Sequence, residues 1–202
     1  MKKIALLLAA VMMMTVFAAC GGNTNETTAP ETTVPETTVA PETTVPAETE
    51  VPADTEFVMP EADAELAEMF DKLYAEIPVE LPVMTMPVDL ADEYMRTTYL
   101  GGAAAEGIDA AAFSESMIGA QAFSISLVRC ADADTAKAVA QTMFDNINTR
   151  KWICVEASDK QAASFENYAV FIMVDPELGV TAEQLMTGFS TVFGGEIENI
   201  IK

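Results

Sequence analysis

The sequence contains no histidine. Histidine is the commonest general acid-base residue and metal ligand in proteins, and it is the side chain whose ordinary pKa lies nearest neutral pH. Its absence excludes hydrolases that rely on a serine-histidine pair, metal sites built on imidazole, and histidine-based pH switches.

Basic residues are also scarce, with 10 Lys and Arg against 32 Asp and Glu, for a formal net charge of -22 at pH 7. Such a charge repels phosphate, and no basic stripe with interleaved aromatic residues offsets it, so we expect no nucleic-acid partner. Docking to anionic lipid through a polybasic surface is excluded for the same reason. A cationic partner or a cation-rich wall surface fits this charge, as does the simpler interpretation that the charge keeps the protein dispersed.

Cysteine occurs only three times, at Cys20, Cys130 and Cys154. These spacings do not match the paired-cysteine motifs of redox or zinc sites. Cys130 and Cys154 each border an apolar, strand-like run. They are therefore candidates for a disulfide in an exported protein, or for small buried thiols.

Residues 1–19 have the pattern of an export signal. Lys2 and Lys3 precede an apolar stretch from Ile4 to Phe17, which is too short to form a membrane-spanning helix.

The signal ends in Phe17-Ala18-Ala19-Cys20, which resembles the lipobox of bacterial lipoproteins. Ala18 and Ala19 match the small residues of that motif, whereas Phe17 replaces its usual aliphatic residue. The resemblance implies cleavage before Cys20 and attachment of a diacylglyceryl group, with acyl chains such as palmitate, to its thiol. The protein would then be anchored to the cell membrane on its extracytoplasmic face without spanning it. The alternative is an ordinary signal-peptidase site that leaves Cys20 as a free thiol.

Residues 20–59 are predicted to be the lipidated cysteine followed by a disordered tether rich in Thr, Pro and Glu. A Pro-Glu-Thr-Thr-Val unit begins at Pro30, Pro35 and Pro41, and no basic residue occurs from Asn23 to Met59. Regularly spaced prolines block helices and sheet ladders, and like charges extend the chain, so we interpret the segment as a spacer. At about 3.1 Å per residue it would reach on the order of 100 Å. Its threonines also permit O-glycosylation.

Residues 60–202 are predicted to form one α+β globular domain. Apolar residues at helical spacing predict a helix from Leu66 to Ile77, and a shorter helix is predicted from about Asp89 to Tyr99. The apolar stretch 78–87 between them is interrupted by prolines and is predicted to run extended, along a surface or as an edge segment.

The second half of this domain alternates strands and helices. Strands are predicted at 122–130, at 152–155 and at 168–174. A long helix starts at Asp132 or Asp134, and Thr181 with Gln184 forms a capping box for a C-terminal helix. The strand-helix-strand-strand order predicts a small antiparallel or mixed sheet with the helices packed on one face.

The arrangement is similar to a family of bacterial cell-surface lipoprotein domains of unknown function, over roughly residues 60 to 193. The motifs that carry the resemblance are the helix 66–77, Tyr99-Leu100-Gly101 followed by Gly107-Ile108-Asp109, the strand into Ala131-Asp132, and the return strand 167–172. Members often carry acidic residues where this chain has Phe123-Ser124. The resemblance implies a fold and an extracytoplasmic location, and no activity.

Candidate nucleophiles lack an activating partner in the sequence. Ser114 and Ser116 flank Glu115, Ser124 and Ser126 share a strand face, and none lies in a GxSxG motif. The lysines that would assist a serine are interpreted as surface or loop residues; they are Lys72, Lys137, Lys151 and Lys160. We therefore predict no catalytic, cofactor-binding or metal-binding residue, and no cofactor.

Carboxylates occur in close groups, which are Asp89 with Asp92 and Glu93, Asp132 with Asp134, and Asp175 with Glu177. Two carboxylates facing each other across a sugar-binding cleft would suit a glycosidase. Helix capping explains Asp132 and Asp134 more simply, and this run lacks the glycine and later glutamate of a calcium loop.

Methionine is frequent, with Met84 and Met86 close together, and a Met-lined groove for a peptide or lipid-like ligand is one interpretation. Core packing is the other, and it is favoured for Met143, Met173 and Met186, as it is for Trp152.

Together these features predict a membrane-anchored extracytoplasmic lipoprotein that acts as a non-catalytic binding or scaffolding module of the bacterial cell envelope. Its partners would be the membrane, through the lipid, and an envelope protein or wall polymer. The alternative is a cell-wall polymer hydrolase that uses paired carboxylates.

Overall fold

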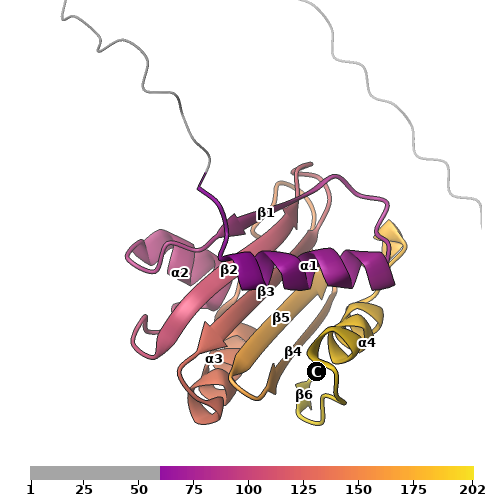
Figure 1. Cartoon of the computed structure of the whole chain (residues 1–202). Coiled ribbons are helices and arrows are strands. Elements are labelled where there is room, and N and C mark those ends of the chain that lie inside the picture. The colour runs from indigo at the N-terminus through magenta and orange to yellow at the C-terminus, as the bar shows by residue number, and fades with distance from the viewer. Residues whose placement is uncertain (1–59) are drawn as a thin grey trace, which may run out of the picture. The chain divides into compact units, whose positions relative to one another are not determined.

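The computed structural model describes residues 60–202 (Figure 1). The predicted signal peptide, Cys20 and the predicted tether lie outside these residues and stay predictions. Within residues 60–202, no helix has the length and apolar composition needed to cross a membrane.

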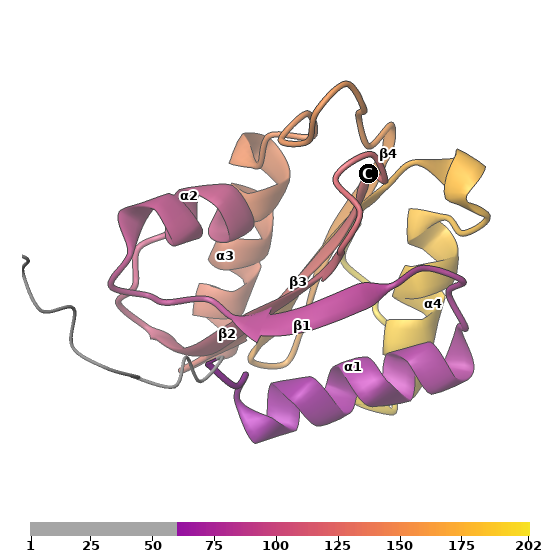
Figure 2. The same cartoon turned by 90° about the horizontal axis from the view of Figure 1, so that it is seen from above.

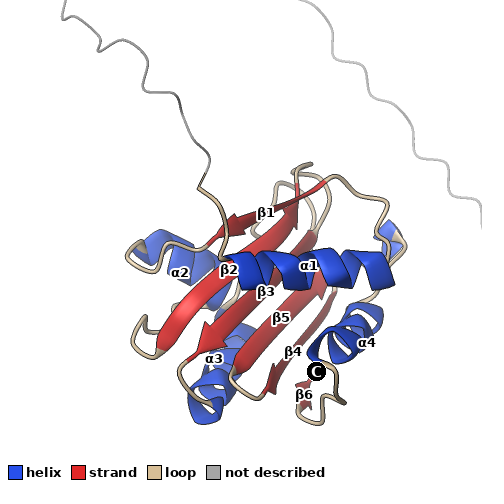
Figure 3. Ribbon diagram, viewed as in Figure 1, coloured by secondary structure: helices blue, strands red, loops and turns tan. Residues whose placement is uncertain are grey.

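A six-stranded antiparallel sheet forms the centre of the domain, in the order β1-β2-β3-β5-β4-β6 (Figure 3). The strands are β1 (Val83–Pro87), β2 (Ile108–Ser116), β3 (Phe123–Cys130), β4 (Asp159–Phe165), β5 (Tyr168–Val174) and β6 (Ile200–Ile201). With the four α-helices packed on it, this sheet confirms the predicted α+β class.

The helices cover both faces of the sheet, so the prediction of one covered face was wrong (Figure 2). Helices α1 (Ala64–Glu76) and α4 (Ala182–Phe193) pack on one face, and α2 (Glu93–Leu100) and α3 (Ala133–Asn146) pack on the other. Strand β3 shows the reason, because Ile125 and Leu127 join the first core while Val128 and Cys130 join the second. A strand with buried residues on both faces needs helices on both.

Two strand assignments differ from the sequence-based prediction. The run 152–155 is a loop, and the strand lies further along at β4, while β2 was not predicted at all. Cys154 has a φ of 66°, a left-handed conformation that a strand does not accommodate. β4 has little β-propensity of its own, with adjacent Ala162 and Ala163, and is held between β5 and β6.

The helix starts follow local capping chemistry. Asp132 is the N-cap of α3, where its carboxylate accepts a hydrogen bond from the Thr135 N–H at 2.7 Å. Thr181 and Gln184 form the predicted capping box of α4. Both predictions are confirmed, because each depends only on residues within one turn.

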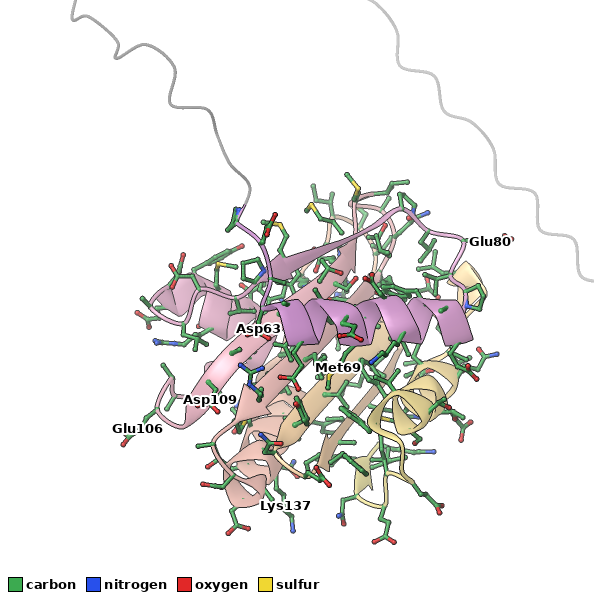
Figure 4. The ribbon with its side chains drawn as sticks, viewed as in Figure 1. Asp63, Met69, Glu80, Glu106, Asp109 and Lys137 are labelled. Carbon is green, nitrogen blue, oxygen red and sulfur yellow. The ribbon has the colours of Figure 1, made fainter. Side chains whose placement is uncertain are left out.

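An ionic cluster fastens the start of α1 to the sheet. Arg129 of β3 donates to both carboxylate oxygens of Asp63, at 3.1 and 3.2 Å, and also pairs with Glu65. The Tyr168 hydroxyl donates to Glu65, and burial together with this carboxylate raises the pKa of Tyr168 to about 12. Asp63 stands directly at the beginning of α1 (Figure 4). The point at which the chain enters the domain is thus tied to two central strands.

Candidate functional site

An open groove of about 560 Å³ lies between the first half of α1 and the sheet edge formed by β1. Ala64 and Ala67 line the helix side, and Thr85 and Met86 line the strand side. Small residues on α1 leave this space unfilled because their side chains do not reach β1.

The outer edge of β1 offers unpaired backbone groups to this groove. The Val88 N–H bonds to the Ala111 carbonyl, and the Met117 N–H bonds to the Pro82 carbonyl, each at 2.8 Å. Because hydrogen bonding alternates along an antiparallel strand, Val83 and Thr85 direct their N–H and C=O groups away from β2. β1 is the last strand of the sheet over residues 60–202, so these groups have no strand partner there. The predicted edge segment is confirmed.

The groove is acidic. Glu61, Glu68 and Asp71 line its helix side. Glu68 pairs with Lys72 at 2.9 Å on an exposed surface, where such a pair neutralises little of the local field. Within the described part of the chain, Glu61 and Asp71 form no ion pair. The groove therefore suits a positively charged ligand.

A second groove, of about 530 Å³, lies between α3 and the opposite sheet edge, where Lys137 and Ile200 are among its lining residues. Here β6 already pairs with Ala162 and Ala163 of β4. Because the chain itself occupies part of this edge, the site offers less free backbone than β1.

Lys151 takes part in a buried polar cluster. It lies in the loop after α3, in line with the prediction of a surface or loop residue, but the prediction of a solvated side chain was wrong. Its ammonium group pairs with the carboxylate of Glu115, donates to Ser124 Oγ at 3.1 Å, and lies 4.1 Å from the centre of the Tyr99 ring. The Lys151 side chain is 12% exposed. Glu115 and Ser124 are direct cross-strand neighbours on β2 and β3. This contact could not be predicted from the sequence, because the long helix α3 separates Lys151 from both strands along the chain.

The geometry of this cluster indicates a role in stabilising the fold and does not fit a catalytic site. A serine-lysine catalytic pair needs an accessible hydroxyl and a lysine free to take its proton. Ser124 is 1% exposed, and the Lys151 ammonium is held by the Glu115 carboxylate. Burial lowers the pKa of Lys151, while Glu115 opposes this shift. The pair fixes the loop after α3 against the sheet.

Most of the carboxylates named from the sequence lie at helix starts, and Asp89 lies just before α2, where it accepts a hydrogen bond from the Ala91 N–H at 2.9 Å. Asp92 caps α2, Asp132 caps α3, and Asp175 caps the short 3-10 helix η1 (Pro176–Leu178). The Thr135 N–H lowers the pKa of Asp132, which is opposite to the shift that a general acid needs. In the region 60–202, no three His, Cys, Asp or Glu residues are grouped to hold a metal ion. Helix capping accounts for Asp92, Asp132 and Asp175.

Four sulfur-containing residues of the described domain are buried in the core; they are Cys130, Met143, Met173 and Met186. Cys130 and Cys154 are free thiols, the first buried and the second exposed, and the structure does not join them in a disulfide. Burial raises the pKa of the Cys130 thiol to about 11, which keeps it protonated and unreactive. Met143, Met173 and Met186 are buried, as predicted for core packing. Trp152 packs against the core under α2 and α3, which also confirms its predicted role.

In comparisons with known proteins, no family model, no curated protein and no solved structure matches the chain. The resemblance to lipoprotein domains therefore stays a prediction. The acidic β1 groove was not predicted as such, and of the methionines considered for a Met-lined groove only Met86 lines it. Pro82 and Pro87, which bracket β1, were a signal for an edge segment.

Proposed function

We propose that this protein is a lipid-anchored extracytoplasmic module of the bacterial cell envelope that binds another envelope component without transforming it. The observation that supports binding most strongly is the free edge of β1 beside the acidic groove on α1. Unpaired strand edges are a common means of capturing extended segments of other proteins.

The proposed location rests on the sequence around Cys20. Two acyl chains on one thiol anchor a protein firmly, since each buried methylene contributes about 0.8 kcal/mol. The segment up to residue 59 would then set how far from the membrane the groove is presented, on the order of 100 Å at most.

Binding is favoured over hydrolysis because the groups that would carry catalysis serve the fold. The Lys151 ammonium pairs with Glu115, and Asp92, Asp132 and Asp175 cap helices. Incubation with purified wall polymer is expected to release no soluble fragments above those released in buffer. Release that disappears in an Asp92→Asn or Asp132→Asn variant would overturn the non-catalytic part of the proposal.

The anchor is tested by metabolic labelling with an alkyne-bearing palmitate, followed by separation of membrane and soluble fractions. The wild-type chain is expected to be labelled and membrane-bound, and Cys20→Ser to lose both properties. Cys154→Ser is the matched control, because it removes an exposed thiol from the described domain. Equal labelling of Cys20→Ser and wild type would refute the anchor.

A further inference from the structure

We propose that the groove between α1 and β1 binds an extended peptide segment carrying lysine or arginine, which adds to the sheet as a strand on the outer edge of β1. This inference rests on the proposed binding function and names its site and its class of partner.

The backbone of β1 defines a short docking edge. Val83 and Thr85 each direct one N–H and one C=O group outward. Pro87, the next outward-facing residue, has no N–H to offer, and Pro82 at the other end faces β2 through its carbonyl. A partner strand therefore gains a few hydrogen bonds, and Pro87 limits the open-ended pairing that leads to aggregation.

The two faces of the added strand meet different surroundings. Thr85 pairs with Ser114, and the Tyr74 hydroxyl of α1 bonds to Ser114 Oγ at 2.6 Å, so Thr85 lies on the α1 face. A partner residue opposite Thr85 therefore points toward α1 and its carboxylates. Its two neighbours along the partner strand point to the other face, beside Met84 and Met86, because side chains alternate. The fitting pattern is a basic residue between two apolar ones.

Charge selects this partner over two other occupants. The chain's own residues 23–59 contain glutamates and no lysine or arginine, so they would place like charge against Glu68 and Asp71. A second copy, with the same net charge of -22, would bring two acidic α1 helices together. A basic partner instead gains attraction at the carboxylates that line the groove.

The probe is a fluorescein-labelled valine-lysine-valine-lysine-valine peptide, titrated with the full chain in neutral detergent and followed by fluorescence anisotropy. We expect saturable binding that is at least about tenfold tighter than for the peptide with glutamate in place of lysine. Replacing the peptide N–H that faces Thr85 by N-methyl is expected to weaken binding about fivefold, the value of one hydrogen bond. This measurement uses the wild-type protein and needs no variant to fold.

Variants of the protein test separately the hydrogen bonds at the β1 edge and the attraction by the groove carboxylates. Thr85→Pro removes an outward N–H without breaking the β2 ladder and is expected to weaken binding about fivefold, whereas Thr85→Val retains the N–H and the affinity. Glu68→Gln with Asp71→Asn is expected to weaken binding and reduce its salt dependence. Glu106→Gln with Glu198→Gln, two exposed residues outside the groove, changes the net charge equally and should leave binding intact.

Three results would overturn the proposal. Equal affinity for lysine and glutamate peptides would refute charge selection. Unchanged affinity for the N-methylated peptide would refute strand addition. Equal losses in the groove pair and in the control pair would show general electrostatic attraction. Because the titration does not depend on acylation of Cys20, its failure leaves the palmitate-labelling result standing, and a failed label leaves the peptide result standing.

Discussion

The buried pair of Lys151 and Glu115 gives the sharpest test of how this domain is held together. Their side chains are 12% and 22% exposed, and Lys151 also contacts Ser124 and the Tyr99 ring. Glu115→Gln leaves the ammonium buried without its counter-charge. Breaking a buried pair in this way costs about 3–5 kcal/mol of unfolding free energy, and partial exposure here reduces the expected loss to about 2–3 kcal/mol.

A double-mutant cycle isolates the pair from the packing of its side chains. We expect Lys151→Met with Glu115→Gln to cost less than the sum of the two single changes, by about 1–2 kcal/mol, since neither residue is then left unpaired. Urea unfolding of the full chain is the assay. Trp152, the only tryptophan, has its ring 5.2 Å from the Lys151 nitrogen and reports on this region directly.

The pH dependence of Glu115→Gln gives a second readout with a definite sign. Burial lowers the folded-state pKa of Lys151 below its usual value of 10.5. Over the interval between the lowered pKa and 10.5, the unfolded chain binds more protons than the folded one, so stability rises with pH. Removing the Glu115 carboxylate, which opposes this shift, lowers the pKa of Lys151 further in Glu115→Gln than in the wild type. The stability deficit of Glu115→Gln is thus expected to shrink as pH rises toward 10, and adding Lys151→Met is expected to abolish this trend. If each single change lowers the unfolding free energy by less than about 0.5 kcal/mol and the two losses are additive, the pair does not stabilise the domain.

Two further predictions concern packing and the clamp on α1. A Cβ at Gly188 of α4 would lie 2.7 Å from atoms of both Leu73 and Ile77, so Gly188→Ala is expected to lower the unfolding free energy by about 1 kcal/mol despite the better helix propensity of alanine. Gly119→Ala, where no atom lies within 4 Å, is the control, and equal unfolding midpoints for the two variants would contradict the close approach of α4 to α1. Arg129→Met is expected to cost about 1 kcal/mol at pH 7, because the Asp63 carboxylate is one-third exposed and screened by solvent. The Arg129 guanidinium lowers the pKa of Asp63 below 3.8, so the wild type loses this contribution as pH falls below about 4, and a constant difference between wild type and Arg129→Met from pH 7 to pH 2 would refute the linkage.

Capping and continuous apolar runs were readable from the sequence. Asp132 and the Thr181-Gln184 pair mark helix starts because an N-cap satisfies N–H groups within one turn of itself. β5 was predicted with its observed bounds, since a run of buried apolar residues is typical of a central strand. The prolines around β1 likewise predicted an extended run, either along a surface or as an edge segment, and the structure shows the edge.

Tertiary structure decided the features whose residues are distant in sequence or weak in local propensity. β4, with its paired alanines, becomes a strand because β5 and β6 provide its hydrogen-bond partners. Covering both sheet faces buries Ser124 and Ser126, although their alternation with Phe123, Ile125 and Leu127 is the pattern of a half-buried strand. Lys151 meets Glu115 only once α3 has folded back across the sheet, and the groove exists only where the small residues of α1 lie beside β1. Local pattern determined the elements of this protein, and long-range packing determined which side chains and backbone groups those elements bring together.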